Sequence, residues 1–133
     1  MTIDEARVVI STVFATSWGS TTVLILPNEK YTPIPGTPWT RLTYQELYGG
    51  QQTLGPIGSR KYERRSLIFL EFYGLLDVGS KATSDYVHTA RGILEGRDFS
   101  GVSVFNLFVQ DEGEDDRWYR VVLQGLLTYN ETK

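Results

Sequence analysis

The stretch WYRVVLQGLLTY, residues 118–129, decides what kind of fold this chain forms. Within it, one set of apolar and aromatic residues alternates with more polar neighbours: Tyr119, Val121, Leu123, Leu127 and Tyr129. Successive side chains of a strand point to opposite faces of a sheet, so a period of two predicts a strand with one face on a core. We therefore expect the chain to end in a strand of a half-buried sheet.

Four further strands are predicted upstream of this stretch. Residues 61–73, KYERRSLIFLEFY, alternate in the same way, and these members share one face: Tyr62, Ile68, Leu70 and Phe72. Residues 102–110 form another apolar run, and residues 39–48 predict a strand that leads into a hairpin. Residues 21–26 are apolar and β-branched, and Pro27 ends them because proline lacks the amide hydrogen that a strand ladder needs.

Two segments have the period of a helix. Thr2 and Glu5 have the spacing of a capping box, and a helix that ends near Gly19 should follow. Its apolar stripe is Ala6, Val9, Ile10, Val13 and Phe14. A second helix is expected over residues 82–94, before the stop signal Gly96. The residues expected on its inner side are Ala82, Tyr86, Ala90, Ile93 and Leu94.

These elements predict an α+β fold with a mostly antiparallel β-sheet and two helices packed on one face. The 133 residues, 41% of them hydrophobic, suit a single domain that spans residues 1–133. The proline-rich segment, residues 28–39, should be an extended loop that only connects its neighbours. Residues 49–58 contain four glycines, which indicates a hairpin tip.

Composition argues against several classes of function. The chain has no cysteine and one histidine, His88, which leaves few options for catalysis, a metal or another cofactor, so we expect a protein that is not an enzyme. A net charge of −3 disfavours a protein that grips nucleic acid by its phosphates. No window approaches about 18 apolar residues and the N-terminal segment is charged, so we expect no membrane association and a cytoplasmic location.

An acidic run, DEGEDD, occupies residues 111–116. Its carboxylates are Asp111, Glu112, Glu114, Asp115 and Asp116. A calcium loop of the EF-hand kind needs alternating ligands and a distant glutamate, and the spacing here does not provide them. We predict a solvated turn that stays extended through charge repulsion unless a basic surface meets it.

A basic run is the natural partner for these carboxylates. Arg60, Lys61, Arg64 and Arg65 lie close together, and a neighbouring copy could bring them against residues 111–116. Aromatic residues dominate both cores and interfaces, and the chain has 8 Tyr, 6 Phe and 3 Trp. Trp39, Trp118 and Tyr119 could be core residues or interface anchors. The candidate interface is therefore these residues: Arg60, Arg64, Arg65, Tyr48, Asp111, Glu112, Glu114, Asp115, Asp116 and Trp118.

Taken in order, several motifs resemble the tail terminator-like proteins of long-tailed bacteriophages, a minor tail and neck protein family. They are PNEKYTP at 27–33, PWTRL at 38–42, YERRSLIFLEFY at 62–73, FSGV at 99–102 and the closing WYRVVLQGLLTY. The resemblance covers nearly the whole chain. It implies an α+β structural virion protein that is assembled in the host cytoplasm and forms a hexameric ring on the tail tube. Such a ring stops tube polymerisation and provides the surface where the head docks.

The same resemblance implies the partners. They are further copies of the chain, the tail tube protein and a head–tail connector or neck protein, while DNA passes through the ring without specific binding. The acidic run could instead line that passage, where negative charge would repel DNA. Two other functions stay open: another head–tail joining or head-completion protein, and a small ligand-binding α+β module.

Overall fold

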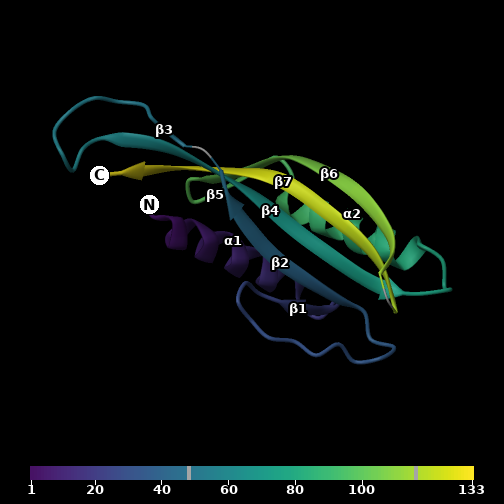
Figure 1. The fold of residues 1–133 in the computed structure, drawn as a ribbon. Helices are drawn as coiled ribbons and strands as arrows, with labels where there is room; N and C mark the ends of the chain where they lie inside the picture. The colour runs from purple at the N-terminus through teal and green to yellow at the C-terminus, as the bar shows by residue number, and fades with distance from the viewer. Residues whose placement is uncertain (48, 116) are drawn as a thin grey trace.

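The structure is a computed structural model that describes residues 1–47, 49–115 and 117–133. In this part of the chain a curled seven-stranded sheet forms the body of the molecule (Figure 1). The strands are β1 (Val23–Ile25), β2 (Trp39–Glu46), β3 (Gly50–Gln51), β4 (Lys61–Leu75), β5 (Arg97–Phe99), β6 (Val102–Asp115) and β7 (Trp118–Thr132). Their order is β1-β2-β4-β7-β6-β5, with β3 paired to β4. Only the β1–β2 pair is parallel among the described strands, which confirms the predicted α+β class.

The centre of the sheet is the pair of 15-residue strands β4 and β7. Their antiparallel register runs from Lys61 opposite Thr132 to Leu75 opposite Trp118. Along β4 every second side chain from Ser66 is buried, as the alternation predicted. In β7 the predicted inner residues are also buried, apart from Tyr119, which is only half-buried.

Helix α1, Ile3–Trp18, begins at the predicted capping box. The Thr2 hydroxyl accepts a hydrogen bond from the Glu5 amide at 3.2 Å, and Glu5 Oε2 accepts one from the Thr2 amide at 3.0 Å. These two bonds satisfy amides that a helix otherwise leaves free at its start. The buried residues of α1 are Ala6, Ile10, Phe14 and Trp18, while Val9 and Val13 are half-buried at the margin of the stripe.

Helix α2, Lys81–Leu94, forms where it was expected, and its predicted inner face was right in part. Ala90 and Leu94 are buried, and Tyr86 and Ile93 are half-buried against the core. Thr83 and Val87 are buried as well, while Ala82 is exposed. The reason lies in β4, where Gly74 has no side chain and Thr83 packs against it. That close approach fixes the rotation of the helix about its axis. No helix in the described part of the chain is long and apolar enough to cross a membrane.

Both helices cover one face of the sheet, where the main core lies. A second, smaller cluster lies on the opposite face, because its sheet residues have the opposite parity along β2, β4 and β7. It contains Ile25, Trp39 and Trp118, with Tyr31, Tyr73 and Leu75 packed against them. Tyr31 comes from the proline-rich segment, whose expected role as a mere connection was therefore wrong. That segment covers the second cluster.

The acidic run was predicted to be a turn, and this prediction was wrong for most of it. Strand β6 continues through Asp115 and pairs with β7 as far as Trp118, with a register shift between Asp111 and Gly113. Asp116 lies outside the described residues. The backbone of the run is drawn into the sheet because β7 continues opposite it and provides ladder partners. Strands β3 and β5, which were not predicted, have two and three residues, too few to show a period.

Candidate subunit interface

The basic and acidic runs lie at opposite ends of the sheet. Arg64 is opposite Tyr129 of β7, whereas Asp115 is opposite Trp118 at the start of the same strand. At about 3.3 Å per residue, roughly 35 Å of strand separates these two positions. A single copy therefore cannot bring the two runs together. They can meet only between copies.

At the basic end, the guanidinium of Arg64 is already engaged inside the chain. Its Nε lies 2.9 Å from Glu131 Oε1, both side chains are largely shielded, and its Cζ lies 4.8 Å from the centre of the Tyr62 ring. Arg60 Nε donates to the carbonyl of Gly55 at 2.9 Å. Of the predicted arginines, Arg65 is the most exposed, because its contact with Glu63 is a 3.4 Å surface pair.

Tyr129 lies in an apolar environment beneath the charged residues of the basic end. Burial first, then the nearby carboxylates of Glu46 and Glu131, raises the pKa of its hydroxyl to about 12. The hydroxyl donates to Glu46 at 3.5 Å. The basic end is thus built on a closed core, and its exposed basic side chains include Lys61, Arg65 and Lys133, with Glu63 beside Arg65.

A loop projects from the basic end (Figure 1). It is residues 52–60, between β3 and β4, and we call it the arm. The arm contains two very exposed apolar residues, Leu54 at 93% and Ile57 at 87%. Sequence reasoning predicted the hairpin but missed these two, although two aliphatic residues flanking Gly-Pro in a polar loop were a readable signal. Tyr48, the other predicted contact before this hairpin, lies outside the described residues.

At the acidic end, Asp111 is engaged inside the chain. Its two carboxylate oxygens accept a hydrogen bond from the Tyr119 hydroxyl, at oxygen–oxygen distances of 2.6 and 2.7 Å. This hydrogen bond raises the pKa of Tyr119. Glu112 and Glu114 are exposed. Among the described strands, β5 pairs only with Val102–Val104, so the outer edge of β6 beyond that point faces no other strand. No three histidine or acidic side chains in the described ranges converge as metal ligands would.

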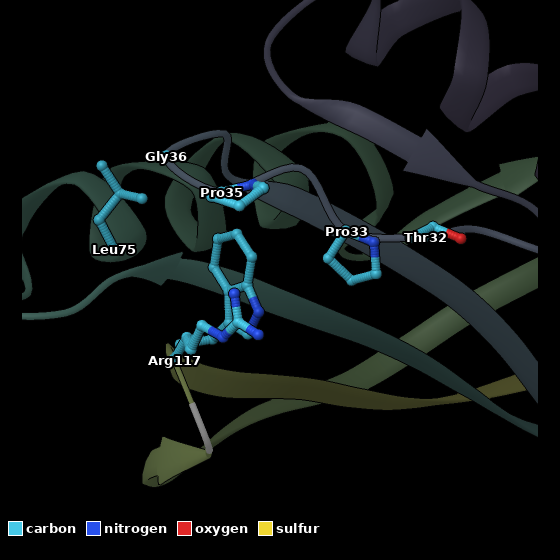
Figure 2. Close-up of a pocket in the computed structure, with 7 residues that line it drawn as sticks. Thr32, Pro33, Pro35, Gly36, Leu75 and Arg117 are labelled. Carbon is cyan, nitrogen blue, oxygen red and sulfur yellow. The ribbon is translucent and has the colours of Figure 1, made fainter.

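Trp118 is mostly buried, with 8% of its surface exposed, and packs edge-on against Trp39 at 6.2 Å. It also helps to line a hollow of about 300 Å³, which we call the end pocket. Figure 2 shows Pro33, Pro35 and Leu75 around this hollow, with Arg117 on another side. Sequence reasoning identified Trp118 as a contact candidate but missed the proline segment as a wall.

The end pocket rests on a stack of aromatic rings. Trp39 lies between Tyr31 and Tyr73, with ring centres 5.2 Å and 3.9 Å apart and planes within 8° and 5° of parallel. Tyr73 donates to Glu71, which also binds Arg120 at 2.9 Å. Burial, then the hydrogen bond and charge of Glu71, raises the pKa of Tyr73 to about 12. These contacts fix the wall of the pocket in place.

His88 is exposed on α2 and lies beside a second hollow of about 250 Å³. Ser84, Arg91 and Asp111 are among the residues that line it. The Asp111 carboxylate accepts a hydrogen bond from the Tyr119 hydroxyl, and Arg91 Nε forms an ion pair with Glu95 at 3.1 Å. Two of the charged groups there are thus already engaged by other side chains of the protein.

Comparisons with known proteins inform the fold rather than the function. No model of a known protein family matches the chain, and no curated protein matches it. Among solved structures, one similar chain has a TM-score of 0.65 and 12% sequence identity, and the match covers 92% of this chain and 94% of the other. At that identity the likeness shows a shared fold alone. Because both coverages are high, the shared unit is nearly the whole of each chain.

Proposed function

We propose that the protein is a tail terminator of a long-tailed bacteriophage, which assembles as a ring at the head-proximal end of the tail tube. The observation that supports this best is the placement of opposite charges at the two ends of one sheet. Contacts between two different patches of identical subunits are heterologous, and they close into a ring when the rotation between neighbours allows it. Opposite charges fix the register of such contacts and disfavour wrong ones.

The resemblance in the sequence gives this ring its place in the virion. One face of the ring would cap the tail tube protein and stop its polymerisation, and the other would receive the head–tail connector or neck protein. DNA would pass through without specific binding, consistent with a net charge of −3 on each copy. This function needs no catalysis and no cofactor. Glu112 and Glu114 serve either the contact between copies or the lining of the passage.

The test is to delete the gene from its phage and to measure tail lengths by electron microscopy of the lysate. A terminator predicts overlong tails without heads, because nothing then stops tube growth. Tails of normal length that lack heads would assign the protein to a later joining step and contradict the proposal. Fully infectious particles would contradict it as well. Complementation from a plasmid, which should restore normal tails, is the control for effects on neighbouring genes.

A further inference from the structure

We propose that the arm of one copy inserts Leu54 and Ile57 into the end pocket of the next copy. This contact rests on the proposed head-to-tail ring and names the surfaces that hold it together. A heterologous contact needs a protruding patch and a receiving patch on different parts of the same chain. The arm and the end pocket are such a pair.

The arm has the properties of an inserting element. Leu54 and Ile57 are 93% and 87% exposed, so nearly all of their apolar surface meets water in a single copy. The arm is braced from within: Ser59 donates to the Pro56 carbonyl at 3.2 Å, and Arg60 to the Gly55 carbonyl at 2.9 Å. A loop ordered before it binds loses less conformational entropy on binding.

The end pocket has the properties of a socket. Its walls are the proline rings of the segment before β2, Leu75 and the indole of Trp118, on the stacked rings of the second cluster. Its volume of about 300 Å³ is at the small end of the range for ligand pockets, roughly 300–1,000 Å³. Walls of this kind suit an aliphatic side chain, which carries no polar group that needs a partner.

Position and charge both identify the occupant as a second copy. The arm extends beyond the Lys61 end of β4, while the end pocket lies at the Leu75 end, so a chain cannot fill its own pocket. Lys61 directly follows the arm and Arg65 lies four residues further along β4; both are exposed, and Glu63 between them contacts Arg65 at 3.4 Å. Glu112 and Glu114 lie on β6 at the end where the pocket is, although Arg117 on the pocket rim is basic. When the arm is inserted, Lys61 and Arg65 of one copy come against Glu112 and Glu114 of the next.

A disulfide trap tests the contact, because the chain has no native cysteine. The variants are Ile57→Cys on the arm and Pro35→Cys on the pocket wall, each alone and both together, oxidised at high protein concentration. We expect the double variant to give a ladder of linked copies on a non-reducing gel, and a mixture of the single variants to give a 57–35 linked dimer. Peptide mass spectrometry identifies the linked positions. Absence of the 57–35 disulfide, or linkage only between equal positions, would overturn the contact.

A second measurement avoids any change to the buried wall of the pocket. Replacing Leu54 and Ile57 with Ser should leave the melting temperature unchanged and weaken self-association at least tenfold by sedimentation velocity. Val8→Ser is the matched control, since Val8 is 62% exposed on α1, away from the arm and the pocket. An arm variant that associates as well as the original chain, or no worse than the Val8 variant, would overturn the contact.

The two proposals can fail separately. Overlong tails in the deletion phage, without a 57–35 disulfide, would overturn the arm contact and leave the terminator function standing. A 57–35 disulfide in a protein whose deletion leaves particles fully infectious would keep the contact and overturn the function. An arm that binds the tail tube protein instead would give no 57–35 linkage.

Discussion

At the scale of single residues, Tyr44 shows how a polar group is held at the margin of the core. Its hydroxyl lies 2.9 Å from the Ser11 hydroxyl and donates to the Arg7 carbonyl at 3.4 Å. Burial is the largest influence on it and raises its pKa to about 12, although the Ser11 hydrogen bond and the Arg7 charge act in the other direction. The folded chain therefore favours the neutral form of the Tyr44 hydroxyl.

This pKa predicts a loss of stability at alkaline pH. An unfolded tyrosine titrates near 10, so the contribution of Tyr44 is complete below about pH 10 and is lost as pH rises toward 12. Tyr73 and Tyr129 act in the same direction. We expect the urea midpoint to be constant from pH 7 to 9 and to fall between pH 10 and 12. Tyr44→Phe should make that fall shallower, and an unchanged slope would contradict the assignment.

Arg64 shows what a sequence does not reveal about a single residue. The run of basic residues marked it as an interface candidate, but its partner, Glu131, is 67 positions away along the chain. Only the register of β4 against β7 brings the two together. Arg65, its neighbour, points to the other face of the sheet and is more exposed. The sequence therefore shows the basic run only as a group, and the fold distinguishes its members.

At the scale of elements, the seating of α2 on β4 depends on one missing side chain. A Cβ on Gly74 would overlap Thr83 Oγ1, so Gly74→Ala should lower the free energy of unfolding by about 1–3 kcal/mol. In a Thr83→Ala background the same change should cost clearly less, because the overlapping atom is gone. Chemical denaturation of the four proteins of this cycle measures the difference.

The matched control lies in the same helix. A Cβ on Gly92 would meet nothing within 4 Å, so Gly92→Ala should stabilise the protein by about 0.5–1 kcal/mol through helix propensity alone. If Gly74→Ala were as well tolerated as Gly92→Ala, the seating described for α2 would be wrong.

Strands were easier to predict than the face of α2, for a physical reason. Along β4 a period of two leaves only two possible faces, and the apolar residues choose between them. A helix can rotate by any angle about its axis, and the buried stripe of α2 includes the polar Thr83, with Tyr86 and Ile93 half-buried at its margin. Which stripe of α2 faces the sheet depends on Gly74 of β4. The spacing of apolar residues within α2 carries no information about that residue.

At the scale of the whole molecule, the candidate interface could be predicted only in part. The two charged runs were visible in the sequence, but their separation to opposite ends follows from the β4–β7–β6 register. The end pocket was not visible at all, because residues 32–36 and Trp118 are far apart in the chain and converge only in the fold. Long-range pairing of this kind has no local signal.

This separation of charge predicts how association depends on charge and salt. Arg65→Glu and Glu114→Lys should each weaken self-association by about two- to thirtyfold, since an exposed pair contributes about 0.2–1 kcal/mol and a reversal adds repulsion. Combining them keeps the net charge of −3 and should recover most of the loss. Sedimentation velocity at 50 and 500 mM NaCl measures this, and the original chain should associate less well at the higher salt.

The double variant decides whether the two ends meet, because each single variant also changes the overall charge. Lys81→Glu is the matched control: Lys81 is 92% exposed on α2, and its partner Asp85 belongs to the same helix. It changes the net charge as much as Arg65→Glu does and leaves Arg65 and Glu114 in place. Lys81 follows Leu75 by six residues, so the change adds negative charge at the acidic end, where it should not weaken a contact with a basic partner. If Lys81→Glu weakened association equally, general repulsion would explain the effect. If the double variant associated no better than either single one, the acidic strand would not face the basic end, and lining the passage would be its remaining use.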